Sequence, residues 1–113
     1  MRVALLALPG SMKSAIAGLA DMFWLANQVI AQHPDPAHAE PFFNVTVVSE
    51  DGQAVPDAQG RQIDCESAFA DGGRFELIIA SGMRLDEEKF PIAPEAVASA
   101  AEWIKAQAAQ GTC

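Results

Sequence analysis

Two cysteines are the strongest nucleophiles in the chain, and neither stands where an α/β enzyme places its nucleophile. Such a residue normally sits on a sharp turn between a strand and a helix. Cys65 instead ends a short predicted strand, and Cys113 follows the glycine that caps a predicted helix. Neither has a histidine nearby in the sequence, so we interpret both as free, non-catalytic thiols.

Two histidines and three acids are the other candidates for catalysis or metal binding. His33 and His38 lie on a proline-rich segment without cysteines at metal-ligand spacing, which favours a solvated loop. Glu50 and Asp51 belong to an ordinary turn sequence. Asp21 lies on the polar side of a predicted helix. We therefore predict no catalytic residue and no metal site.

The segment from Gly10 to Ser14 follows a predicted strand and opens a predicted helix, as a phosphate-binding loop does. That pattern needs a second glycine directly before the lysine, and this position is Met12. We interpret the segment as a strand-to-helix turn in which Ser11 or Ser14 caps the helix. No cofactor is predicted.

Strand and helix patterns alternate along the whole chain. Continuous apolar runs are typical of strands buried on both faces, and a 3.6-residue period is typical of helices. The predicted elements are a strand at 3–8, a helix at 14–31, a strand at 43–49, a hairpin of 53–56 with 61–65, a strand at 75–81 and a helix at 94–110. This order predicts a three-layer α/β sandwich with a mainly parallel sheet.

Ligands of such sheets bind at the carboxyl ends of the strands. In this sequence those ends lead into short loops rich in glycine and serine. The candidate ligand-binding residues are Pro9, Gly10, Ser11, Ser81, Gly82 and Met83. We expect the backbone N–H groups of Gly10 and Gly82 to make the polar contacts.

Apolar stripes predict which helix faces are buried. The first helix has two stripes, one of Ile16, Leu19, Ala20, Phe23, Asn27 and Ile30, the other of Ala15, Gly18, Met22, Leu25 and Val29. One covers the sheet and the other faces a neighbouring helix or a second subunit, so we expect a homo-oligomer, a dimer. The last helix is expected to bury Val97, Ala100, Ala101, Ile104 and Ala108.

The charge balance excludes some partners. Fifteen acidic against seven basic residues give a net charge of −8. Phosphate backbones and anionic membranes attract basic proteins, so we expect this chain to touch neither. We find no stretch approaching the length of a membrane-spanning helix. Two widely spaced cysteines do not form a disulfide framework, which favours the cytoplasm.

Several segments together resemble a known family. The run Leu6-Ala7-Leu8-Pro9-Gly10, followed by Ala17-Gly18-Leu19-Ala20-Asp21-Met22-Phe23, resembles the opening of class I glutamine amidotransferase-like domains of the PfpI/ThiJ superfamily. Residues 21–27 are similar to a stretch in the N-terminal sensor domains of AraC-type transcription regulators. Residues 47–52, 60–64 and 75–82 keep the same order and spacing. The resemblance spans essentially the whole chain and implies a flavodoxin-like sheet.

Two departures from the family pattern bear on function. Catalytic members carry an acid in the first helix, and by register that position is Ala15. The family's nucleophile elbow comes after the helix that contains Trp103, and the chain stops at Cys113. The resemblance thus implies that residues 1–113 are the N-terminal portion of the domain. The catalytic histidine and the DNA-binding domain are expected outside this chain.

The resemblance implies a non-enzymatic ligand-sensing or dimerisation domain of an AraC-family regulator. Its effector is an unknown small molecule, and DNA is reached only through a domain absent from this chain. The alternative is a fragment of a PfpI-like cysteine enzyme, such as a hydrolase, hydratase or glyoxalase-type lyase. Under either interpretation we expect an exposed sheet edge and apolar face, which pairing or oligomerisation covers.

Overall fold

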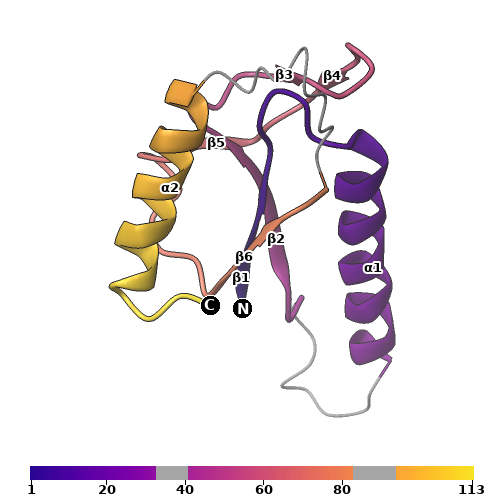
Figure 1. The fold of residues 1–113 in the computed structure, drawn as a ribbon. Helices are drawn as coiled ribbons and strands as arrows, with labels where there is room; N and C mark the ends of the chain where they lie inside the picture. Colours follow the sequence, from indigo (N-terminus) through magenta and orange to yellow (C-terminus); the bar gives the residue numbers. More distant parts are fainter. Residues whose placement is uncertain (33–40, 83–93) are drawn as a thin grey trace.

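The computed structural model describes residues 1–32, 41–82 and 94–113 of the chain. Its main sheet has the order β5-β2-β1-β6, with every pairing parallel. The strands of this sheet are β1 (Arg2–Leu6), β2 (Asn44–Ser49), β5 (Ser67–Ala68) and β6 (Leu77–Ala80). Helices α1 (Lys13–Ala31) and α2 (Pro94–Ala108) lie on opposite faces of it (Figure 1). The predicted three-layer α/β sandwich is confirmed.

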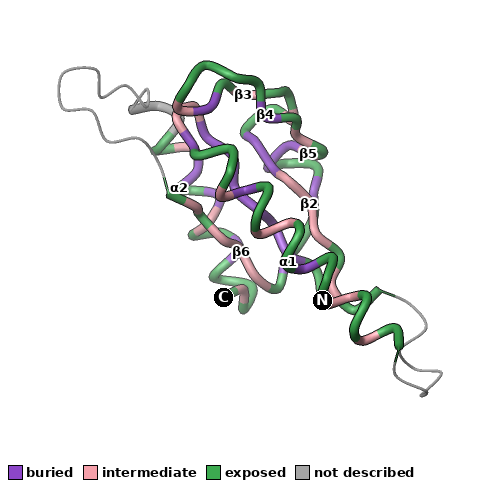
Figure 2. Tube along the Cα trace, turned by 90° about the vertical axis from the view of Figure 1, so that its right-hand side faces the viewer, coloured by how far each residue is buried: buried purple, intermediate pink, exposed green. Residues whose placement is uncertain are grey.

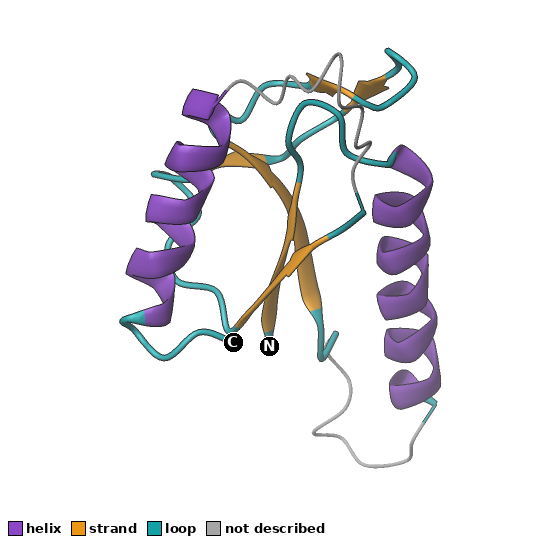
Figure 3. Cartoon of the chain, in the orientation of Figure 1, coloured by secondary structure: helices purple, strands orange, loops and turns teal. Residues whose placement is uncertain are grey.

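A short hairpin lies at the end of the sheet where β1 and β2 finish (Figure 3). It consists of β3 (Val55–Pro56) and β4 (Gln62–Ile63), which pair antiparallel. The predicted hairpin is confirmed, although its strands are shorter than expected. The short strand β5 is not among the sequence-based predictions, because two residues carry too little of a pattern to be recognised.

Strand β1 is the centre of the core, with neighbours on both edges and a helix over each face. Val3, Ala4 and Leu5 are completely buried. Successive side chains of a strand point to opposite faces. Ala4 therefore packs in the cluster on the α2 side, while Val3 and Leu5 pack in the cluster on the α1 side. This two-sided burial explains why the run is apolar throughout.

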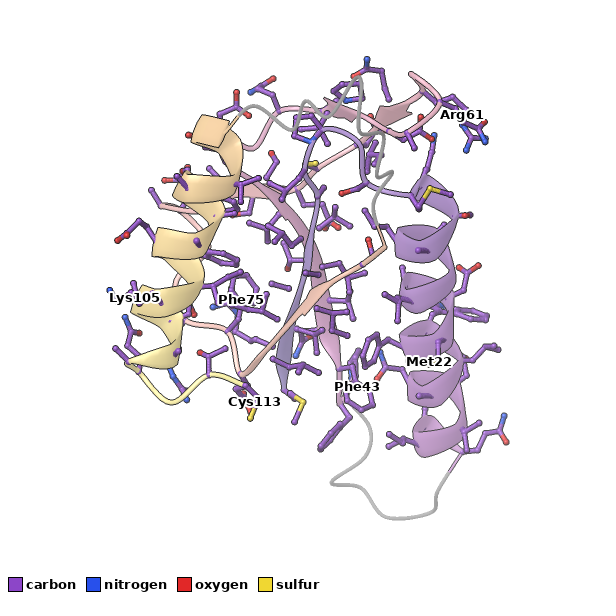
Figure 4. The ribbon with its side chains drawn as sticks, viewed as in Figure 1. Met22, Phe43, Arg61, Phe75, Lys105 and Cys113 are labelled. Atoms are coloured by element: carbon purple, nitrogen blue, oxygen red, sulfur yellow. The ribbon has the colours of Figure 1, made fainter. Side chains whose placement is uncertain are left out.

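The inner stripe of α1 packs on the sheet as predicted. Ile16 and Phe23 are buried, and Phe23 meets the ring of Phe43 at 4.9 Å between centroids. Figure 4 labels Phe43 on the side of the sheet that faces α1. The Asn27 side chain donates to the carbonyl of Phe43 at 2.9 Å and accepts from its N–H at 2.8 Å. Asn27 therefore anchors the entry into β2.

Helix α2 buries a face that only partly matches the predicted one, since Ala100 is buried and Ile104 packs against the core as expected. Trp103 and Gln107 are buried beside Ala100, whereas Val97 is 44% exposed. Ala101 and Ala108, also expected inside, are exposed. The Trp103 ring stacks on Phe69 at 4.6 Å, and this large contact decides how the helix is turned. Alanines contribute too little area to compete with it.

The residues after α2 return to the sheet. Gly111 adopts a φ of 92° and ends the helix, as predicted. Cys113 then donates its N–H to Glu76 and accepts from the N–H of Ile78, at 3.0 and 2.9 Å. These two bonds are one step of a parallel pairing on the outer edge of β6. Strand β6 is the last strand of the described sheet on this side. Its apolar side chains from Leu77 to Ile79 are only half-buried.

Two predictions about α1 are wrong. The helix begins at Lys13 with Met12 as its N-cap, and no side chain caps it. Ser11 instead accepts a hydrogen bond from the N–H of Leu8. The second wrong prediction is that no stretch approaches the length of a membrane-spanning helix. Helix α1 is long and apolar enough to cross a membrane, judged by length and composition alone. Its packing on the sheet through Ile16 and Phe23 is that of a helix in a globular domain.

Gln107 makes a polar link between α2 and the segment that leads into β6. Its Oε1 accepts from the N–H of buried Phe75 at 2.8 Å, and its Nε2 donates to the carbonyl of Gly73 at 2.8 Å. Gln107→Ala leaves the Phe75 N–H buried without its acceptor, and we expect a loss of about 1–3 kcal/mol in the free energy of unfolding. Urea denaturation measures it. The control Gln110→Ala, at an exposed position three residues on, is expected to change little.

Candidate ligand-binding site

The loop after β1 is held almost entirely by its own backbone and by the hairpin. Gly10, at a φ of 94°, donates its N–H to the carbonyl of Pro56 at 3.0 Å. Ser11 is 2% exposed, and its hydroxyl accepts from the N–H of Leu8 at 2.9 Å. The Ser11 carbonyl accepts from Ala58 at 3.0 Å. The Gly10 N–H, which we expected to contact a ligand, is therefore already occupied.

A buried carboxylate, Asp57, organises the turn of the hairpin. It accepts from the N–H of Gln59 at 2.9 Å and from the N–H of Arg61 at 2.7 Å. The Arg61 guanidinium adds an ion pair at 2.9 Å. Burial alone raises the pKa of the Asp57 carboxyl, but these N–H groups and the guanidinium lower it below its ordinary value. Figure 4 labels Arg61 at the outer end of this hairpin.

A small pocket opens at the carboxyl ends of β1 and β2. Its volume is about 150 Å³, and it is lined by Ala7, Leu8, Pro9, Glu50, Asp51 and Val55. Pockets for whole drug-sized ligands measure about 300–1,000 Å³, so this one has room for a fragment-sized group. Of the five predicted ligand-binding residues that the structure describes, Pro9 alone lines it. Four apolar side chains and two carboxylates give the pocket its chemistry.

The end of β6 lies beside the loop after β1. The Met12 N–H donates to the carbonyl of Gly82 at 2.9 Å, which brings the two predicted loops together. The Ser81 hydroxyl is buried and has no hydrogen-bond partner among the described residues. Gly82 is exposed, with open space where a side chain would stand. Met83, the sixth candidate, lies outside the described residues.

The two thiols occupy different surroundings. Cys65 is half-buried, with its sulfur 3.5 Å from the carbonyl oxygen of Ile63. Burial raises the pKa of the Cys65 thiol; the hydroxyl of Ser49 partly offsets this, and the nearby Asp64 carboxylate adds to it. Cys65 is therefore a neutral thiol at pH 7. Cys113 is exposed and lies beside β6. In the sequence it is far from the loops that follow β1 and β6.

The remaining candidates do not gather at one place. Lys13 and Asp21 are exposed on α1, as expected for solvent-facing residues. Asp51 accepts from the N–H of Gln53 at 3.0 Å, which is the turn chemistry predicted for this segment. No group of three or more metal-binding side chains occurs among residues 1–32, 41–82 and 94–113. His33 and His38 lie outside these ranges.

Sequence reasoning missed the residues that hold this site together. Asp57 lies between the two predicted strands of the hairpin, and the burial of its carboxylate was not predicted. The spacing of Asp57, Gly60 and Arg61 is the one available clue, because such a turn suits an aspartate that bonds its own backbone. The docking of the hairpin on the loop after β1 joins Pro56 to Gly10, and no local pattern encodes that contact.

The described architecture is a three-layer α/β arrangement, and ligands of such parallel sheets bind at the carboxyl ends of the strands. Solved structures share this arrangement. A protein described as a transcriptional regulator from Vibrio parahaemolyticus superposes with a TM-score of 0.71 at 14% identity, over 99% of this chain and 53% of its own. An AraC family transcriptional regulator from Pseudomonas putida gives 0.69 at 19%, over 98% and 52%.

Oxidized DJ-1 from Toxoplasma gondii also superposes, with a TM-score of 0.63 at 16% identity, over 98% of this chain and 52% of its own. The fold is thus the one found in AraC-family regulators and DJ-1/PfpI superfamily proteins, and the predicted resemblance is confirmed at that level. The chain spans about half the length of these solved chains. No protein-family model and no curated protein sequence matches it.

The Asp57 carboxylate makes the hairpin sensitive to acid. Its pKa lies below that of an unfolded aspartate, about 3.9. The stabilisation is therefore present above that value and disappears as the pH falls through the folded-state pKa. We expect Asp57→Asn to lower the urea midpoint clearly at pH 7, with the difference from wild type shrinking as the pH falls through the folded-state pKa of Asp57.

Asp64→Asn is the matched control, because this exposed aspartate lies on the same hairpin. We expect its urea midpoint at pH 7 to stay close to that of wild type. An Asp57→Asn midpoint that differs from wild type equally at neutral and acid pH contradicts the role given to the carboxylate charge.

Proposed function

We propose that this chain is the N-terminal half of a non-catalytic sensor domain in an AraC-family transcription regulator. The observation that carries the proposal is the chemistry at the carboxyl ends of the strands. The small pocket there is lined by apolar groups and two carboxylates, with no thiol or imidazole among its lining residues. Ala15, in the first turn of α1, stands where catalytic relatives carry an acid.

The charge of the chain also supports a sensor domain that does not itself contact DNA. A net charge of −8 suits a domain that leaves DNA contacts to another part of the protein. The small pocket suits part of a small effector, whose other contacts would come from residues beyond those described here. Ser81 supports this reading, because its buried hydroxyl has no partner within the described part of the chain.

The second candidate is a fragment of a PfpI-like cysteine enzyme. The fold is compatible with it, because DJ-1 of Toxoplasma gondii has this fold as well as the regulators. A fold hosts many functions, so the site decides. Cys65 argues against this candidate, since a thiol with a raised pKa is a poor nucleophile at neutral pH.

Reading the gene beyond codon 113 separates the two candidates. The regulator predicts a downstream basic segment with two helix-turn-helix units, and a domain without a cysteine elbow followed by a histidine. The enzyme predicts that elbow and histidine, and no helix-turn-helix. Finding the second arrangement overturns the proposed function.

Thiol reactivity tests the non-catalytic assignment directly. In a Cys113→Ser variant, Cys65 is the remaining thiol, and we expect iodoacetamide to modify it several-fold more slowly at pH 7 than free cysteine. Burial and a raised pKa both reduce its thiolate. The matched variant Cys65→Ser retains the exposed Cys113, which is expected to react faster. A Cys65 that outpaces Cys113 is an activated thiol and favours the enzyme.

A further inference from the structure

The β3–β4 hairpin forms one wall of the candidate pocket. Val55 of β3 lines the pocket together with Leu8, which belongs to the core and is 7% exposed. The hairpin itself is mostly at the surface. Between residues 53 and 65 only Asp57 and Ile63 are buried, and Figure 2 shows how much of this segment is exposed. The pocket therefore combines a wall fixed in the core with a wall from an exposed element.

Two backbone hydrogen bonds hold the hairpin to the loop after β1. The N–H of Gly10 donates to the carbonyl of Pro56, and the N–H of Ala58 donates to the carbonyl of Ser11, both at 3.0 Å. We call these two bonds the clasp. Pro56 directly follows the pocket-lining Val55, and Gly10 directly follows the loop residues that line the pocket. The spacing between the two walls therefore depends on the clasp.

Asp57 holds the two hairpin residues of the clasp in position. It lies between Pro56 and Ala58, and its carboxylate accepts from the N–H groups of Gln59 and Arg61 and from the Arg61 guanidinium. These bonds fix the shape of the turn, so that Pro56 and Ala58 reach the loop at the same time. The carboxylate thus acts on the clasp through the turn, without touching the loop itself.

The other walls of the pocket are attached more firmly. Ala7 and Leu8 are buried, and the N–H of Ala7 donates to the carbonyl of Val48 in β2 at 2.8 Å. At the base of the hairpin, the buried hydroxyl of Ser49 donates to the carbonyl of Gln53 at 2.9 Å. Because the pocket of about 150 Å³ is small for a whole effector, a larger ligand requires a wall to move. Exposed elements with few contacts are the ones that open locally.

A thiol lies directly against the hairpin wall. The N–H of Val55 forms a hydrogen bond with the sulfur of Cys65, and both residues pack against the core cluster on the α1 side. Cys65 is half-buried in this position. A movement of Val55 away from the pocket breaks this contact and uncovers the sulfur. Cys65 is therefore a built-in reporter of the position of the hairpin.

We propose that the β3–β4 hairpin is a strap, the movable wall of the candidate pocket, which opens by releasing the clasp and carries Val55 away from Leu8. A ligand group enters or leaves through this opening, and the clasp closes over it. Opening replaces the two clasp bonds by bonds to water and leaves the sheet intact, so it is a local excursion of the folded protein. Its use by an effector rests on the proposed function, whereas the opening itself is a property of the hairpin.

Amide hydrogen exchange of the full 113-residue chain, followed by NMR, tests the strap. The N–H of Gly10 belongs to the clasp, and the N–H of Ala7, three residues earlier, bonds to β2. We expect Gly10 to exchange about tenfold faster than Ala7 or more, after correction for intrinsic rates, because strap opening releases Gly10 alone. Asp57→Ala is expected to accelerate Gly10 by about another tenfold, and to leave Ala7 unchanged. Equal protection of the two amides overturns the proposal.

Thiol modification provides the second measurement. In a Cys113→Ser background, we expect Asp57→Ala to speed the reaction of Cys65 with dithionitrobenzoate by about tenfold. Gln107→Ala is the matched control, because it weakens the packing of α2 on the other side of the sheet and leaves the hairpin as it is. Its Cys65 is expected to react as in the parent chain. Equal acceleration in both variants shows that the thiol is reached by general unfolding, which overturns the strap.

Arg61→Ala keeps the test open if Asp57→Ala does not fold. It removes only the guanidinium of a half-exposed side chain, so we expect a smaller acceleration of Gly10 exchange and Cys65 modification in the same direction. A Cys65 rate that is the same in every variant also overturns the strap. Neither measurement uses an effector or the downstream gene sequence, so failure of the strap and failure of the proposed function are separate results.

Discussion

The burial of β1 on both faces is the constraint on which the rest of the structure depends. Its pairings with β2 and β6 use both of its edges, and its side chains alternate between the α1 and α2 clusters. Leu8 continues the same run into the loop and remains 7% exposed. Because every direction around β1 is occupied, the loop that follows it can leave in only one way, toward the hairpin at the carboxyl end of the sheet.

The fold could be predicted from the sequence wherever a pattern is long and local. The run from Val3 to Leu8 and the inner stripe of α1 each repeat one period often enough to identify an element and its buried face. Helix α2 shows the limit. Its face is decided by the ring of Trp103 meeting Phe69, residues 34 positions apart whose contact has no local signal. Counting apolar residues therefore placed Ala100 correctly but also selected Ala101 and Ala108, which are exposed.

The candidate site was less predictable than the fold for a related reason. The order of elements indicates which loops meet, and the bond from Met12 to Gly82 joins two of them as expected. The order does not indicate which backbone groups remain free. Gly10 gives its N–H to Pro56, and Ser11 turns its hydroxyl inward. The first contact comes from docking of the hairpin and the second from the loop itself, and Val55 and the two acids line the pocket beside them.

Helix α1 connects the candidate ligand edge to the core of the domain. Its N-terminal end is attached to that edge through the Met12 N–H, which donates to the carbonyl of Gly82. A helix is a stiff element, and Asn27 fastens the far half of this one to the start of β2. Between these two attachments, Ile16 and Phe23 pack in one cluster with the residues of β1. The central strand is thus the common support of helix α1 and of the ligand edge.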